Sequence, residues 1–280
     1  SNAIANQFIV QQANINAVPL IQGDFSTGNV GIGTTTPSQK LDVDGSINIA
    51  EGSAYRYGGV TALWLRKTGA DAFYGSTFVG EGAGSTNASS TQQTATGYNA
   101  GRENIGERQT ATGYTAGYQN TGESQTATGY YAGRENTGAR QTTIGSYAGY
   151  LNTGAYQTAT GYLAGHKNTG AHQTATGYYA GRQNEGARVS GFGYEATYLN
   201  TADDVVAIGY QAGKSNAIAN QFIVQQANIN AVPLIQGDFQ TGNVGIGTTA
   251  PGATLHVSGD YTPLFASATS GKVAIFDTAF

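Results

Sequence analysis

The sequence predicts an all-β protein, an elongated fibre built on a β-solenoid (β-roll) with a 16-residue repeat. The first observation behind this fold class is a set of eight glycines spaced 16 residues apart. The second is a period-two alternation of residue types before each glycine, which is typical of a β-strand. The third is a pair of near-identical segments, 1–37 and 215–251, that flank the repeats. The repeat glycines are Gly97, Gly113, Gly129, Gly145, Gly161, Gly177, Gly193 and Gly209.

Residues 1–46 are predicted to form a small β adapter module, and residues 215–260 its second copy. The strand-like stretches QFIV and VPLIQGDF are followed by a turn at STGN or QTGN. The duplicated segments differ only by Ser26 against Gln240 and by Thr36 against Ala250. Because the module is copied almost whole, we expect a structural adapter rather than an active site.

Residues 47–90 are predicted to form a connector, and residues 261–280 a strand-rich C-terminal tail. The connector holds the single tryptophan, Trp64, beside Leu63 and Leu65, which indicates a small apolar cluster. It ends with a degenerate first repeat, FVGEGAG, at Phe78–Gly84.

Residues 91–214 contain the repeats, and each repeat, or rung, is predicted to form one turn with two short strands and two corners. Rungs that stack at about 4.8 Å give a rod on the order of 40 Å long for eight rungs. The position before each glycine holds threonine in five rungs and Ile144, Phe192 or Ile208 in the others, so we expect it to face the interior. An interior of Thr, Ala and Gly is thin, which favours association with identical chains.

An asparagine follows each repeat glycine by seven residues. Asparagine tolerates positive φ, so we expect it at a corner, and stacked amides can hydrogen-bond along the axis as a structural ladder. A glutamine before six of the strands predicts a second ladder. The asparagines are Asn104, Asn120, Asn136, Asn152, Asn168, Asn184, Asn200 and Asn216, and the glutamines are Gln93, Gln109, Gln125, Gln141, Gln157 and Gln173.

Composition excludes several classes of function. Charged residues make up 11% of the chain and the net charge is −4, which argues against binding to nucleic acid. The sequence has no long apolar run of the kind that inserts in a membrane. It has no cysteine, so disulfide and thiol chemistry are excluded.

Candidate chemistry is sparse. Glycan hydrolysis needs two carboxylates about 5–10 Å apart, but Glu103 and Glu107 share one corner and Asp203-Asp204 reads as a solvated turn. The DVDGS stretch at 42–46 resembles a calcium loop, yet the second copy reads HVSGD there. His166 and His172 have no obvious third ligand. We therefore expect a protein that is not an enzyme and that has no metal and no cofactor.

A recognition surface is the more credible candidate. The position after each Ala-Gly pair alternates mainly between arginine and tyrosine, which predicts an outward-facing stripe. Such side chains can stack on sugars, pack in protein interfaces or bind acidic groups. The alternative is a solvated stripe or lateral packing between subunits. The candidate receptor-binding residues are Arg102, Tyr118, Arg134, Tyr150, His166, Arg182 and Tyr198, with Tyr131, Tyr147 and Tyr179 beside them.

Ice binding is the second alternative, since a flat face of stacked Thr-x-Thr pairs could order water. The expected interior location of Ile144, Phe192 and Ile208 argues against it, and Ile144 interrupts the rows. The pairs are Thr94/Thr96, Thr110/Thr112, Thr126/Thr128, Thr158/Thr160 and Thr174/Thr176.

Two phrases resemble a known family. GNVGIGTTTPSQKLDVDGSI at Gly28–Ile47 and VAIGYQAG at Val206–Gly213 resemble segments of phage tail fibres of the endosialidase type, which carry a self-cleaving C-terminal intramolecular chaperone. The repeats also resemble the β-roll heads of trimeric autotransporter adhesins. This sequence shows no chaperone segment, which is a departure from the first family.

The resemblance implies a homotrimer in the distal part of a phage tail fibre. The implied function is host attachment by non-covalent recognition of a bacterial surface glycan or protein. The implied partners are two further copies of the chain and an upstream fibre segment, and the implied location is the extracellular virion tail. A bacterial trimeric adhesin head on the cell surface is the alternative.

Overall fold

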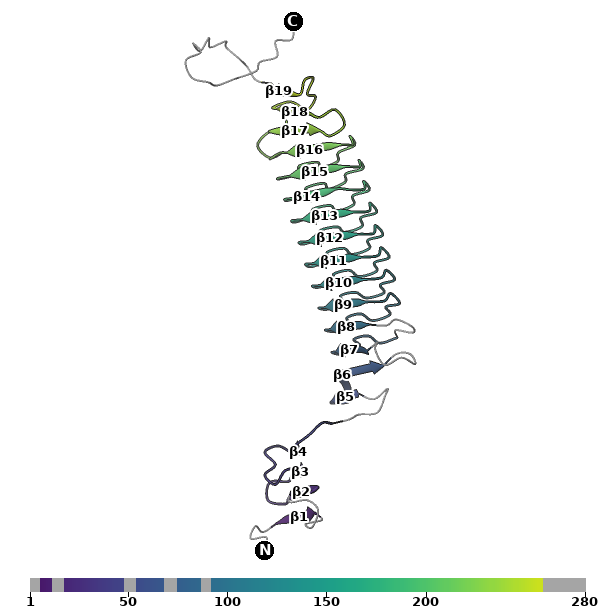
Figure 1. Cartoon of the computed structure of the whole chain (residues 1–280), viewed down its shortest axis with the longest axis vertical. Coiled ribbons are helices and arrows are strands. Elements are labelled where there is room, and N and C mark those ends of the chain that lie inside the picture. The colour runs from purple at the N-terminus through teal and green to yellow at the C-terminus, as the bar shows by residue number, and fades with distance from the viewer. Residues whose placement is uncertain (1–5, 12–17, 48–53, 68–74, 87–91, 259–280) are drawn as a thin grey trace, which may run out of the picture. The chain divides into compact units, whose positions relative to one another are not determined.

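A computed structural model describes residues 6–11, 18–47, 54–67, 75–86 and 92–258. The chain divides into two compact units, residues 1–50 and 51–280 (Figure 1). The described residues form strands and turns and no helix, so the all-β prediction is confirmed. The predicted tail at 261–280 lies outside the described residues.

The first unit is a four-stranded sheet in the order β1-β2-β3-β4. Strands β1 to β3 pair antiparallel, and β4 pairs parallel to β3. The turn between β2 and β3 is fixed by Asp24, whose carboxylate accepts hydrogen bonds from the Ser26 backbone N–H at 2.8 Å and the Thr27 hydroxyl at 2.9 Å. The strands are β1 (Gln7–Val10), β2 (Ile21–Asp24), β3 (Asn29–Ile32) and β4 (Leu41–Val43).

The second unit begins with three antiparallel strands that lead into the solenoid. They are β5 (Ala54–Tyr57), β6 (Val60–Lys67) and β7 (Gly75–Val79). In this sheet Trp64 is in register with Ala54 and Phe78, although its side chain is outside the described part of the structure. β7 then pairs parallel to β8, and the coil begins there.

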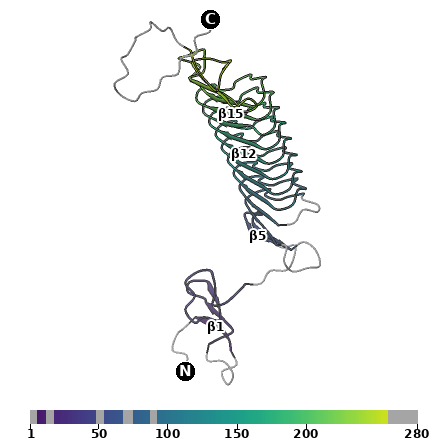
Figure 2. The same ribbon diagram turned by 45° about the horizontal axis from the view of Figure 1, so that its top comes forward.

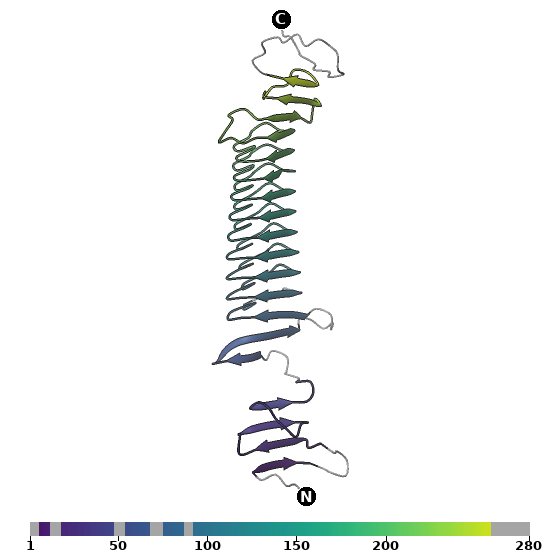
Figure 3. The same cartoon turned by 90° about the vertical axis from the view of Figure 1, so that its left-hand side faces the viewer.

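The solenoid has about nine turns, and its strands stack in one parallel sheet (Figures 1 and 3). Equivalent residues 16 apart are paired directly, as Gln109 is with Gln125 and Gln125 with Gln141. The 16-residue repeat is therefore confirmed as one turn of a β-solenoid. The strands are β8 (Gln93–Thr96), β9 (Gln109–Thr112), β10 (Gln125–Thr128), β11 (Gln141–Ile144), β12 (Gln157–Thr160), β13 (Gln173–Thr176), β14 (Ser190–Phe192) and β15 (Val205–Ile208).

Each described turn of the coil has one strand, not the expected two. The remaining residues form tight turns, which stack evenly along the axis (Figure 2). In the rung of β10, positive φ falls at Tyr131, Glu135 and Arg140 rather than at Asn136. Their N–H groups bond to carbonyls of the preceding rung at 2.8–3.0 Å. Neighbouring rungs therefore satisfy the turn backbone without a second strand.

The expected interior position was wrong. In each QTAT strand the glutamine and the alanine are buried, and both threonines face outward. Ile144, Phe192 and Ile208 are accordingly 44%, 41% and 40% exposed. The interior is instead lined by alanine, with Ala100, Ala116 and their equivalents fully buried, and by amides. A coil this narrow has room for alanine and a flat amide.

Seven of the eight asparagines are buried inside the coil, Asn216 at its end is half-buried, and none has positive φ. Between Asn152 and Asn216 each side-chain amide donates to the Oδ1 atom of the preceding asparagine, at 2.7–3.3 Å. The glutamines do not pair with one another in this way. Gln125 donates from Nε2 to the Gly138 carbonyl, 13 residues later in the same 16-residue turn, at 2.7 Å, and its Oε1 accepts from Asn136 at 3.0 Å. Interlocked amides thus occupy the core positions that apolar side chains fill in wider solenoids.

The C-terminal end of the solenoid passes directly into the second copy of the duplicated segment. β16 (Gln221–Val224) pairs parallel to β15, and β17 (Ile235–Asp238) returns antiparallel to it. β18 (Asn243–Ile246) and β19 (Leu255–Val257) complete the sheet with the same pairing as β3 and β4. The duplicated sequence therefore folds the same way twice.

Candidate functional site

The stripe after the Ala-Gly pairs lies on the turns, and its side chains are in contact with one another. The guanidinium carbon of Arg134 lies 5.0 Å from the ring centroid of Tyr118, 4.9 Å from that of Tyr131 and 5.7 Å from that of Tyr150. Arginine above aromatic faces is a favourable cation–π arrangement. The stripe is thus a packed surface, and Arg102, Tyr118, Arg134, Tyr150, Arg182 and Tyr198 are half-buried.

The same arrangement recurs at the other end of the stripe. Arg182 lies 4.9 Å from the Tyr179 ring centroid and 5.5 Å from that of Tyr198. Lys214 lies 5.4 Å from the Tyr198 ring and forms an ion pair of 2.6 Å with Glu195. Two cation-and-aromatic clusters therefore lie on one side of the coil.

His166 is a correction to the predicted outward stripe. Its side chain is only 7% exposed and lies 5.4 Å from the Tyr150 ring. Burial, together with the nearby positive charges of Arg182 and Lys167, lowers the pKa of His166 to about 4. The imidazole is therefore neutral at pH 7 and separates the two clusters.

A column of stacked tyrosines is the surface feature to which the sequence analysis gave no role. These tyrosines directly follow seven of the eight repeat glycines, and this recurrence was the available signal. Ring centroids of neighbouring rungs lie 4.9–5.2 Å apart with interplanar angles of 3–21°. The column consists of Tyr98, Tyr114 and Tyr130 in one run and of Tyr162, Tyr178, Tyr194 and Tyr210 in another.

Tyr131, Tyr147 and Tyr179 connect the column to the stripe. Tyr131 meets Tyr130 edge-to-face at 4.3 Å, stacks on Tyr147 at 5.1 Å, and carries Arg134 on its ring. Partial desolvation and a hydrogen bond with Tyr131 raise the pKa of Tyr130 to about 12, so its phenol stays neutral at physiological pH. The structure thus brings these three predicted residues together with the tyrosine column in one aromatic surface.

The outward face of the sheet is rich in threonine. Thr94, Thr96 and their equivalents point away from the core, with Ile144, Phe192 and Ile208 in the same rows. The expected burial of these three residues, which argued against ice binding, is therefore wrong. The second argument against ice binding still stands, because Ile144 interrupts the threonine rows.

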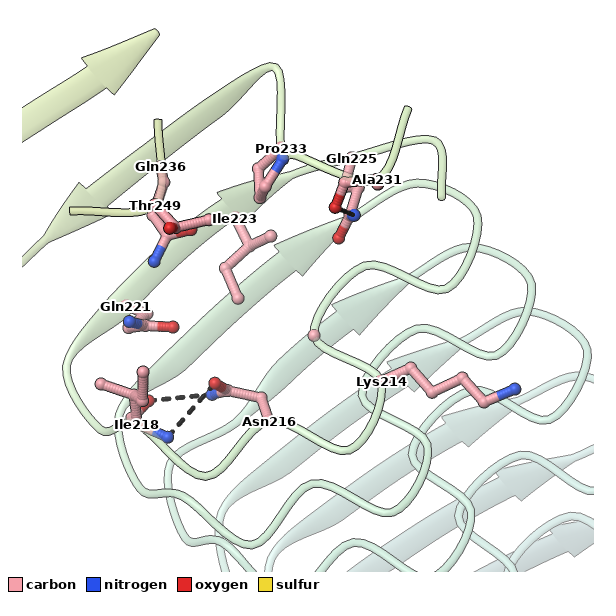
Figure 4. Close-up of a pocket in the computed structure, with 11 residues that line it drawn as sticks. Lys214, Asn216, Ile218, Gln221, Ile223, Gln225, Ala231, Pro233, Gln236 and Thr249 are labelled. Atoms are coloured by element: carbon pink, nitrogen blue, oxygen red, sulfur yellow. Dashed lines mark hydrogen bonds between the residues drawn. The ribbon is translucent and has the colours of Figure 1, made fainter. Parts of the chain in front are cut away.

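A cavity of about 230 Å³ lies where the solenoid meets the second copy of the duplicated segment (Figure 4). Its lining includes Gln221, Gln225 and Gln236 with Ile223 and Pro233. The Gln225 amide already donates to the Ala231 carbonyl at 3.1 Å. The lining is therefore partly committed to internal hydrogen bonds.

The acidic residues considered as catalytic or metal-binding candidates are engaged in structural interactions. Asp203 and Asp204 form ion pairs with Arg188 at 3.5 and 2.5 Å. Asp42, in the calcium-like stretch, accepts hydrogen bonds from the backbone and hydroxyl of Ser38 at 2.9 Å. Among the described residues no three metal-ligating side chains gather. The same part of the chain contains no helix able to cross a membrane.

Comparison with known proteins adds no relative. No family profile, no curated protein and no solved structure matches this chain.

Proposed function

We propose that this chain is a structural and receptor-binding segment of a homotrimeric phage tail fibre that attaches to a bacterial host surface. The observation that carries the proposal is the surface of tyrosine and arginine along one side of the solenoid, in two clusters separated by His166. Arg134 and Arg182 each lie within 5.0 Å of a tyrosine ring centroid, in clusters that recur along the axis. A rigid, shallow and repetitive surface suits extended ligands better than a small molecule in a deep pocket.

The exposed apolar residues on the sheet face support association of identical chains. Ile144, Phe192 and Ile208 share this face with small threonines, and the core beneath is alanine and amide. Packing this face against two further copies would bury the apolar rows that the coil itself leaves in water. The two adapter copies would then join the solenoid to neighbouring fibre segments.

Aromatic rings beside arginine support recognition of surface glycans or proteins. Tyrosine combines apolar ring area with a polar hydroxyl at low entropic cost, and arginine binds acidic groups with two parallel hydrogen bonds. A homotrimer would present three such surfaces, so weak single contacts would add to useful avidity. A bacterial trimeric adhesin head on the cell surface would use the same surface and is the alternative assignment.

The attachment proposal is tested by binding of the purified, labelled protein to a panel of bacterial strains and their isolated surface polysaccharides. We expect wild-type protein to bind a subset of strains, and the R134Q/R182Q double variant to bind at least tenfold more weakly. K167Q is the matched control, because Gln119 and Gln183 occupy the equivalent position in other rungs. Failure of wild-type protein to bind any strain or polysaccharide would contradict the proposal.

Ice binding is a second candidate because Thr126 and Thr128, with their equivalents, are exposed on one face of the sheet. Thermal hysteresis of the purified protein measures it directly. Hysteresis would favour the ice-binding assignment, and its absence would leave the attachment proposal alone.

A further inference from the structure

The tyrosine column is broken at one rung. Of the eight equivalent positions, all of which the structure describes, seven hold tyrosine and one holds Ser146. Below the break Tyr114 stacks on Tyr130 at 5.2 Å, and above it Tyr162 stacks on Tyr178 at 5.1 Å. Tyr130 and Tyr162 therefore lie two rungs apart, roughly 10 Å, with a missing ring between them.

The adjacent Tyr147 does not fill this gap. Tyr147 lies 5.6 Å from Tyr130 at an interplanar angle of 69°. The equivalent pair Tyr114 and Tyr131 has 5.7 Å and 61°, and the pair Tyr162 and Tyr179 has 5.8 Å and 76°. Tyr147 thus keeps the position that its equivalents hold beside an intact column and does not take the place of the missing ring.

The gap has the dimensions of a site for a single ring. Intact rungs show where a ring would lie: about 5 Å from each flanking ring, and edge-to-face with its sequence neighbour at 4.3 Å, as Tyr178 is with Tyr179. A ligand ring would therefore contact two aromatic faces and one further tyrosine. Tyr130, at 46% exposure, is the most exposed tyrosine of the column.

We propose that the gap at Ser146 binds one pyranose ring of a bacterial surface glycan, held between Tyr130 and Tyr162 with Tyr147 at its edge. This inference rests on the proposed attachment function and names the ligand class for that surface. A pyranose has apolar C–H faces and hydroxyls around its rim. The rings of Tyr130 and Tyr162 would pack against the C–H faces. The Ser146 hydroxyl, at the position that holds a ring in the other rungs, would pair with a sugar hydroxyl. The phenyl ring of a host phenylalanine has no group that could pair with that hydroxyl, whereas a pyranose has several.

The direct test is saturation-transfer NMR on the whole chain with methyl pyranosides of glucose, galactose and mannose, and with p-cresol as an aromatic probe. We expect transfer to at least one pyranoside, and at least a tenfold loss of affinity in S146Y, which completes the column. S146A keeps the space and is expected to retain most of the binding. Thermal unfolding of each variant verifies that the solenoid is intact.

A gain-of-site variant provides the matched control. Tyr178 is flanked by Tyr162 and Tyr194, with Tyr179 beside it, so Y178S creates a second gap with the same walls. We expect Y178S to bind two pyranosides per chain, and S146Y/Y178S to bind one. If Y178S binds only one pyranoside per chain, as wild-type protein is expected to do, the inference is contradicted.

Three outcomes would overturn this assignment while the attachment function stands. They are equal pyranoside binding by wild type and S146Y, binding of p-cresol alone, and a change in the solution mass of S146Y, which would assign the gap to contact between copies. Wild-type protein that binds pyranosides through the gap but binds no bacterial cell or polysaccharide would instead contradict the attachment function.

Discussion

The side-chain amide of Asn200 donates a hydrogen bond of 2.7 Å to the Oδ1 atom of Asn184, one rung below, and both side chains are fully buried. Asn184 in turn donates to Asn168 at 3.0 Å and to the Gly186 carbonyl at 2.7 Å. A chain of polar groups in a protein interior is stabilising only while each member has its partner. The stability of the coil therefore depends on the ladder as a unit.

Replacing one member of the ladder is expected to destabilise the solenoid. N184A leaves the Asn168 acceptor and the Asn200 donor without their partner, so we expect a loss of about 2–4 kcal/mol in the free energy of unfolding. Urea unfolding followed by circular dichroism measures this change. The control is T169A, because Thr169 is exposed although it directly follows the ladder residue Asn168. It should change the free energy of unfolding by less than about 0.5 kcal/mol. Equal unfolding midpoints for the two variants would contradict a structural role for the ladder.

The repeat glycines are expected to be intolerant of any side chain. Gly129 has φ of +133°, and a Cβ atom there would lie 2.6 Å from the carbonyl oxygen of Gly145 in the next rung. Because that neighbour is backbone, the clash cannot be relieved by a side-chain rotation. We expect G129A to lose more than about 3 kcal/mol of stability by thermal unfolding.

The matched control for this variant is G252A, since a Cβ atom at Gly252 has nothing within 4 Å. It should unfold with the wild-type midpoint. A G129A protein as stable as G252A would show that the rungs are less tightly stacked than described.

His166 makes stability depend on pH. Its folded-state pKa of about 4 lies below the ordinary value of 6.5, so the native state favours the neutral imidazole. The stabilisation is fully present above pH 6.5 and is lost as pH falls from 6.5 toward 4, by up to about 3 kcal/mol. H166Y places tyrosine where Tyr150 and Tyr198 occupy the equivalent position, and should flatten this dependence. Unfolding midpoints between pH 4 and 7.5 measure the effect, and parallel curves for the two proteins would contradict it.

The sequence predicts how the rungs stack on one another better than it predicts which face of each strand is buried. Strict spacing places Gln125 beside Gln109 and Gln141, and the structure pairs them directly. Period-two alternation separates Ala127 from Thr128 but is the same whichever face is buried. The presence of Ile144 at the threonine position favoured the wrong face, because an apolar residue can equally lie on an exposed sheet.

The sequence also could not predict which side chains on the turns are exposed. His166 shares its position with arginine and tyrosine in other rungs, and only the packing of the coil shows that it is buried. The tyrosine column was visible as a recurrent residue after seven of the eight repeat glycines. Its meaning depends on ring-to-ring geometry, such as the 5.2 Å between Tyr114 and Tyr130, which no spacing in the sequence reports.

The exposed apolar row of the sheet is expected to hold identical chains together. I144D places a charge on this face, where Ile144 is 44% exposed, and should dissociate the oligomer. I105D is the matched control, because Ile105 is also exposed but lies on a turn outside the sheet. Size-exclusion elution at equal protein concentration compares the two variants. Co-elution of I144D with wild type would place the contact between copies on another surface.

The most direct test of the central claim is the solution mass of the wild-type protein by multi-angle light scattering. A homotrimeric fibre requires about three times the chain mass of 28.8 kDa. We expect that mass, together with an elongated particle in small-angle X-ray scattering. A mass equal to one chain would contradict the homotrimer, and would show that an interior of alanine and paired amides is stable without a partner.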